Sequence, residues 1–336
     1  MKKALKAIPC YHVEEDLLNT LGEDKKCKRI EWIDQTRGVL FFFVILCHSC
    51  LAVDWLKYLY EPIFLTGFFF LSGYLYKRKK IFEQLRSVFN GLFMPFLIYS
   101  VLWGFIGCVQ NHSFDKGLNL ALVTLAGGDN IWFIPCLIWV ELIYIVTDYL
   151  TCRYVDIILI AFSCVAFFIV VLSRADNGIW CWTVALYAVG FFAFGDVCKQ
   201  RLLSRNKAIA CMGVYVIGCF VLGCTGCLNQ IDLHLNQYGS APWAFLLAAT
   251  GGCVTFVSVM RYVPVSKYLM EFGNYTLFLF PFHGLVLRQF MKVFGMVGGF
   301  FFSSILILLA TFITCLLLGR VTYKCLPALG GKKKWL

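Results

Sequence analysis

The feature that most constrains this chain is a series of apolar runs, each about as long as a membrane-spanning helix. A bilayer core about 30 Å thick needs roughly 20 apolar residues in a helix. Backbone amides in lipid need partners within the protein, so each run is predicted to be a helix. The ten runs lie at approximately 38–54, 58–76, 88–109, 130–148, 154–172, 178–196, 208–228, 241–261, 274–294 and 297–319.

Composition agrees with a membrane protein rather than a soluble one. The 336 residues are 60% hydrophobic and 15% charged, whereas about 25% of the residues in soluble domains are charged. We therefore expect an all-α fold, a polytopic transmembrane bundle of about ten spans, located in the plasma or inner membrane. The expected parts are a polar extension at 1–29, a membrane domain at 30–325 and a basic tail at 326–336. Residues 1–36 lack the apolar core of a signal peptide, so the first run is expected to direct insertion.

The distribution of Lys and Arg predicts the orientation of the bundle. With a cytoplasmic N-terminus, basic residues cluster at both ends of the chain and after every second run. The opposite connections hold only Lys57, Lys116, Arg174 and Lys292. This asymmetry follows the positive-inside rule and predicts that both termini are cytoplasmic. It also accounts for the net charge of +11, so we expect the lipid bilayer, and no nucleic acid, as a partner.

Seventeen cysteines occur in the chain, and most lie inside the apolar runs. A free cysteine in such a place behaves as a small hydrophobic residue. The C-x-x-C spacings at 47–50 and 224–227 are weak signals, and no spacing is typical of zinc ligands. We therefore expect no metal site and no tightly bound cofactor.

Titratable residues within apolar runs are costly in a membrane, so each is a candidate functional residue. His48, Glu141 and His283 lie inside runs, and we take them as candidate catalytic residues. Asp34 and Arg37 lie at the start of the first run. Structural alternatives stay open for each of them. Arg37 would serve as an anchoring charge, Glu141 as a partner for a neighbouring helix, and the histidines as hydrogen-bonded core residues.

The spacing of Arg37 and His48 places both on one helix face. They are eleven residues apart, which corresponds to about 20° beyond three full turns and about 16 Å along the axis. Asp34 lies one turn before Arg37 and joins the same stripe. A cation at the cytoplasmic surface and an imidazole near the membrane centre suit a substrate with an anionic end and a reactive end. A long phosphorylated thioester has this form.

These residues also resemble the first helix of the acyltransferase-3 family, which carries an Arg, then ten residues, then a His. Arg37 and His48 match this pattern. Further segments resemble later elements of the family in the same order, and together they cover roughly 30–325. They are Phe68-Phe69-Phe70-Leu71-Ser72-Gly73-Tyr74, Met94-Pro95-Phe96, Asn130-Ile131-Trp132-Phe133-Ile134-Pro135, and Asn274-Tyr275-Thr276-Leu277 followed by Phe280 and His283.

The resemblance implies O-acylation, foremost O-acetylation, of a glycan, a lipid-linked sugar or another surface-destined acceptor. The co-substrate would be acyl-CoA, foremost acetyl-CoA. His48 would act as general base for the acceptor hydroxyl or as a transient acyl carrier, because a neutral imidazole accepts protons near pH 7. Arg37 would bind the donor phosphates, with Asp34 and Arg86 as further candidates for the donor site.

The chain departs from the family before Pro95, where family members often have paired arginines. Only Arg86 stands in this segment, so Arg86 or the cluster Lys77–Lys80 is expected to replace them. Two other functions stay open. One is a non-catalytic permease or exporter of a glycan or small metabolite, and the other is a sensor or scaffold whose residues 1–28 bind a partner. The Arg37–His48 stripe and the lack of a detectable internal repeat favour the enzyme.

Overall fold

The computed structural model describes residues 30–49, 54–128, 131–151, 154–200, 205–226, 231–294 and 300–326. The chain divides into two units, Met1–Ile30 and Glu31–Leu336, and only the second is described beyond a single residue. The polar extension predicted at 1–29 and nearly all of the basic tail predicted at 326–336 lie outside the described residues.

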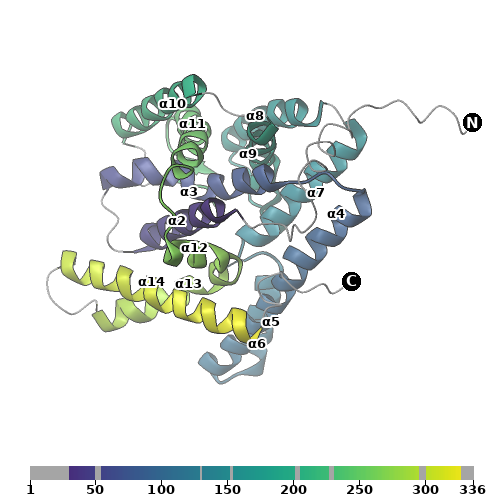
Figure 1. The fold of residues 1–336 in the computed structure, drawn as a ribbon. Helices are drawn as coiled ribbons and strands as arrows, with labels where there is room; N and C mark the ends of the chain where they lie inside the picture. The colour runs from purple at the N-terminus through teal and green to yellow at the C-terminus, as the bar shows by residue number, and fades with distance from the viewer. Residues whose placement is uncertain are drawn as a thin grey trace, which may run out of the picture. The chain divides into compact units, whose positions relative to one another are not determined.

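The second unit is a bundle of α-helices, which confirms the predicted all-α polytopic fold (Figure 1). Its described strands form a single short hairpin. The elements are α2 (Glu31–His48), α3 (Asp54–Leu75), α4 (Ile81–Val88), the π-helical η1 (Phe89–Phe93), α5 (Met94–Asn111), α6 (Phe114–Leu125), α7 (Phe133–Thr151), α8 (Val155–Ser173), the 3-10 turn η3 (Ile179–Cys181), α9 (Trp182–Gln200), α10 (Arg205–Cys224), β1 (Ile231–Asp232), β2 (Gln237–Tyr238), α11 (Pro242–Met260), α12 (Lys267–Asn274), α13 (Thr276–Phe294) and α14 (Phe300–Cys325).

Each of the ten apolar runs coincides with a helix of this bundle. By length and composition, eight helices of the described chain are able to cross a membrane. The remaining two, α2 and α3, are 18 and 22 residues long. They carry charged residues such as Asp34, Arg37 and Glu61, which explains why composition alone does not mark them as spans. The total number of spans therefore stays a prediction.

Helix α2 contacts α3, α11, α12, α13 and α14 (Figure 1). It approaches α12 closely at two glycines, since a Cβ on Gly38 would collide with the carbonyl oxygen of Leu269 and one on Gly273 with that of Asp34. Small residues permit this kind of close helix packing in membranes. The Gln35 side chain binds the backbone of Pro264 and Ser266. The polar start of α2 is thus fixed against the segment that leads into α12.

Four elements were not indicated by the apolar runs. Three are the short helices α4, α6 and α12, and the fourth is the hairpin of β1 and β2, which pairs Ile231 with Tyr238 and Asp232 with Gln237. Helix α6 packs along α5, and its Gly117 lies against Gly104 of that helix. The hairpin matters most for function, because it supplies a wall of the cavity described next.

Candidate functional site

Two cavities lie at opposite ends of the same three helices, α2, α3 and α7. The histidine cavity has a volume of about 310 Å³ and contains His48. The cationic cavity has a volume of about 270 Å³ and contains Arg37. Each of the three helices contributes side chains to both cavities. Arg37 and His48 therefore face different cavities, and the helical rise separates them by about 16 Å.

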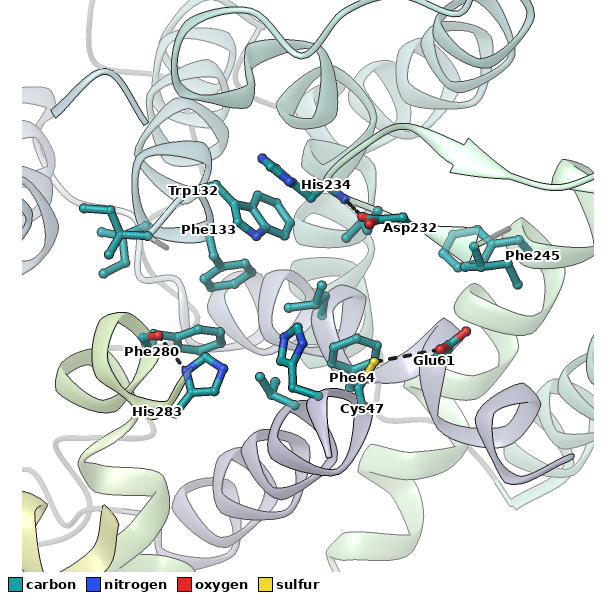
Figure 2. Close-up of a pocket in the computed structure, with 17 residues that line it drawn as sticks. Cys47, Glu61, Phe64, Trp132, Phe133, Asp232, His234, Phe245, Phe280 and His283 are labelled. Atoms are coloured by element: carbon teal, nitrogen blue, oxygen red, sulfur yellow. Dashed lines mark hydrogen bonds between the residues drawn. The ribbon is translucent and has the colours of Figure 1, made fainter. Parts of the chain in front are cut away.

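Two imidazoles meet in the histidine cavity. The ring centroids of His48 and His283 are 5.5 Å apart. His283 is buried, and its Nδ1 lies 2.7 Å from the carbonyl oxygen of Phe280 (Figure 2). A carbonyl oxygen only accepts hydrogen bonds, so Nδ1 carries the proton and Nε2 of the neutral ring is left as an acceptor. His48 is the exposed member of the pair and is open to a substrate in the cavity.

A carboxylate from α3 also lines the histidine cavity. The Cys47 thiol donates to Oε1 of Glu61 at 3.8 Å, and Figure 2 shows this pair beside Phe64. Oε2 of Glu61 is buried without a hydrogen-bond partner among the described residues. Glu61 was not among the predicted site residues. The rule that selected Glu141, a carboxylate inside an apolar run, would have found it.

A second carboxylate comes from the hairpin. Oδ1 of Asp232 accepts from the backbone amides of His234 at 2.8 Å and of Leu235 at 3.1 Å. Asp232 lines the same cavity as His48. The His234 ring stacks on Trp132, with centroids 4.9 Å apart (Figure 2). Nothing in the sequence pointed to Asp232, because long-range packing of a short hairpin brings it to the cavity.

A buried polar network holds the hairpin in place. The Asn236 amide donates to Oδ1 of Asn177 at 2.8 Å and to Oγ1 of Thr183 at 3.0 Å. The Tyr187 hydroxyl donates to Oδ1 of Asn236 at 2.9 Å and lies 2.5 Å from the Tyr238 hydroxyl. Burial raises the pKa of Tyr238 above its ordinary value, so this hydroxyl stays protonated. Satisfied buried networks of this kind are rigid, so the cavity wall is preformed.

The cationic cavity gathers positive side chains at the other end of the three helices. Arg37, Lys77 and Lys79 line it, together with the carboxylate of Glu141. Nη1 of Arg37 lies 3.6 Å from Oδ1 of Asp34, which orients the guanidinium without lining the cavity itself. Arginine binds phosphate through fixed, paired hydrogen bonds, and lysine binds it as a point charge.

The predicted site residues are thus divided between the two cavities. His48 and His283 lie together in one, and Arg37 and Glu141 in the other. Glu141 does not share a cavity with the histidines with which it was grouped. Arg86 is exposed on α4 and lines neither cavity. Of the two expected replacements for the paired arginines, the lysine cluster is the one beside Arg37.

Four phenylalanine rings pack against one another beside the histidine cavity, which Phe133 and Phe280 line. Phe280 stacks on Phe133 with centroids 4.6 Å apart. Its ring also lies 5.1 Å from the rings of both Phe41 and Phe68. All four side chains are buried. Phe41 on α2 and Phe68 on α3 lie between the residues of those helices that line the two cavities, and we call the four rings the aromatic barrier.

Comparison with known families and proteins gives one result. The Acyl_transf_3 model, described as an acyltransferase domain, matches residues 30–320. These residues include both cavities and the aromatic barrier. No curated protein and no solved structure matches the chain.

Proposed function

The chain belongs to the acyltransferase-3 family, and we propose that it transfers an acyl group, foremost acetyl, from cytoplasmic acyl-CoA to a hydroxyl of a surface-destined glycan or lipid-linked sugar. The donor phosphates bind in the cationic cavity, at the end of the bundle that faces the cytoplasm. The acceptor binds in the histidine cavity. The thioester reaches His48 from the donor side, past the aromatic barrier.

The single observation that carries this proposal is the opposite chemistry of the two cavities. Arg37, Lys77 and Lys79 suit an anionic donor. His48 and His283 lie beside two carboxylates in the other cavity, and carboxylates accept hydrogen bonds from hydroxyl groups. An anionic acyl carrier and a neutral, hydroxyl-rich acceptor would each find a fitting environment.

In the proposed reaction, the acceptor hydroxyl attacks the thioester carbonyl carbon. The new C–O bond forms as the C–S bond breaks. His48 accepts the hydroxyl proton and passes it to the departing thiolate, which leaves as the free thiol of CoA. General base catalysis of this kind contributes about 10²- to 10⁴-fold to a rate. His283 supports His48 through its ring contact and its fixed tautomer.

The aromatic barrier weighs against the alternative of a permease. A hydrophilic solute crossing from one cavity to the other would have to displace Phe41, Phe68, Phe133 and Phe280, which are packed together. The thin thioester end of a donor demands a much smaller opening than a sugar does. The barrier thus supports acyl transfer over transport.

The experiment compares surface glycans and lipids from cells with and without the gene by mass spectrometry. We expect loss of one acyl mass from one class of surface molecule when the gene is deleted. Restoring the wild-type chain should restore that mass, and the His48→Ala chain at equal abundance should not. Identical profiles with and without the gene would contradict the proposed function.

A further inference from the structure

The segment 76–80, which joins α3 to α4, directs its basic side chains to two different places. It has no regular secondary structure, and Lys80 has extended backbone angles, with φ −58° and ψ 142°. Lys77 and Lys79 line the cationic cavity, whereas Arg78 between them does not.

Arg78 instead binds three aspartates from three different helices. Its Nε lies 3.3 Å from Oδ1 of Asp148 on α7. Its Nη2 lies 3.5 Å from Oδ2 of Asp156 on α8 and 3.2 Å from Oδ2 of Asp196 on α9. The Tyr144 hydroxyl donates within the same cluster, 2.7 Å from Asp156 and 2.9 Å from Asp196. One guanidinium thus ties the segment to three helices.

The start of the segment is held independently of Arg78. The Lys199 ammonium donates to the carbonyl oxygen of Tyr76 at 2.8 Å. The Tyr76 ring packs on Tyr144, with centroids 4.8 Å apart, and its hydroxyl accepts a hydrogen bond from Gln84. Tyr76 and Gln84 themselves line the cationic cavity, so these contacts fix the start of the segment within the cavity wall, next to Lys77 and Lys79.

We propose that Lys77 and Lys79, with Arg37, bind two phosphate groups of the donor, and that Arg78 is a positioning residue that holds both lysines toward the cavity. The proposal rests on the proposed function, since it names the donor as the ligand. Three cations against the single carboxylate of Glu141 leave the cavity lining with a net positive charge, which suits a diphosphate. A lysine ammonium has no fixed binding geometry, so the backbone must supply its position.

The first test measures binding of CoA and of pantetheine, which lacks the phosphates, to the full chain in lipid nanodiscs by calorimetry. The double variant Lys77→Gln/Lys79→Gln should bind CoA roughly ten- to a hundredfold more weakly and pantetheine as the wild type does. The matched control is Lys80→Gln, which removes a charge from the same segment outside the cavity. Equal losses in the control and the double variant would overturn the proposal, because they would indicate surface charge alone.

The second test concerns Arg78. Arg78→Lys keeps the charge but cannot reach three carboxylates at once, so CoA affinity should fall several-fold while pantetheine affinity is unchanged. A double variant, Arg78→Gln with Asp148→Asn, removes Arg78 together with one of its three aspartates, which keeps the net charge of the cluster unchanged and so limits misfolding. It should show the same selective loss. A merely structural role would weaken both ligands equally, and wild-type CoA affinity in both variants would contradict the positioning role.

Inorganic pyrophosphate separates this proposal from the proposed function. A wild type that binds pyrophosphate with this pattern of variant effects, but does not bind CoA, would support the phosphate site and contradict the acyl-CoA donor. A wild type that binds CoA with affinity unaffected by any of these variants would support the donor and overturn the phosphate site.

Discussion

The two ends of helix α2 differ in chemistry although the same helices build both. At one end, Arg37 lies with lysines that are held on an extended segment. At the other, His48 lies with a second imidazole, two carboxylates and a preformed hairpin wall. The aromatic barrier keeps them apart. In the proposed reaction, α2 carries the anion-binding group at one end and the reactive group at the other.

Replacement of His48, at the end of α2 that lines the histidine cavity, should have the largest effect on acyl transfer. Replacing it by Ala should reduce acyl transfer by at least about a hundredfold, because general base catalysis typically contributes 10²- to 10⁴-fold. CoA binding should be unchanged, since the imidazole lies outside the cationic cavity. Initial rates with labelled acetyl-CoA measure the first quantity and calorimetry the second. His112→Asn is the control, an exposed histidine outside both cavities. Full activity of the His48 variant would refute its catalytic role.

Arg37→Lys should give the next largest effect and act on the donor alone. A lysine keeps the anchoring charge but loses the paired hydrogen bonds to phosphate, which typically costs roughly ten- to a hundredfold in affinity. The KM for acyl-CoA should rise by that factor while the KM for the acceptor stays constant. The comparison variant is Arg86→Lys, on an exposed arginine that lines neither cavity. An unchanged donor KM would mean that Arg37 is only a membrane anchor.

Asp232→Asn should have a smaller effect, confined to the acceptor. The amide keeps an oxygen for the backbone amides of His234 and Leu235 but loses the charge near His48. Loss of one charge-assisted hydrogen bond should raise the acceptor KM by about tenfold and leave the donor KM unchanged. Asp115→Asn on α6 is the matched control. A rise in the donor KM instead would contradict a role of Asp232 in binding the acceptor.

Glu141→Gln should give the smallest effect. This variant distinguishes a carboxylate that opposes an anionic donor from a catalytic carboxylate. In the cationic cavity its carboxylate opposes an anionic ligand, so its neutral analogue should bind CoA a few-fold more tightly, with kcat nearly unchanged. Glu83→Gln on α4 serves as the control. A large fall in kcat with constant donor affinity would support the catalytic role that depth in the membrane first suggested.

Helical periodicity explains what could be predicted from the sequence. The apolar runs predicted helices because lipid requires internal backbone pairing, and eleven residues placed Arg37 and His48 on one face. Depth alone could not assign Glu141 to a cavity. It lies eight residues, or about 12 Å, beyond Phe133 along α7, far enough to leave the histidine cavity.

The positions of Asp232 and of segment 76–80 could not be predicted from the sequence, for a different reason. Asp232 reaches its cavity through a hairpin anchored by side chains of Asn177 and Thr183, more than fifty residues earlier in the chain. The choice between Arg86 and the lysines depended on the direction of segment 76–80, which three distant aspartates determine through Arg78. Contacts between residues so far apart in the chain leave no periodic pattern in the sequence around either residue.

The sidedness of transfer in sealed membrane vesicles tests most directly whether donor and acceptor bind at opposite ends of α2. A reporter fused after Leu336 identifies the face that carries the C-terminus, and membrane-impermeant labelled acetyl-CoA is added outside. Only vesicles with the C-terminus outward should incorporate label. The label, transferred to the acceptor on the opposite side, should resist added esterase until detergent opens the vesicles. Equal labelling of both vesicle orientations, or label that is accessible from the donor side, would contradict a donor and an acceptor at opposite ends of α2.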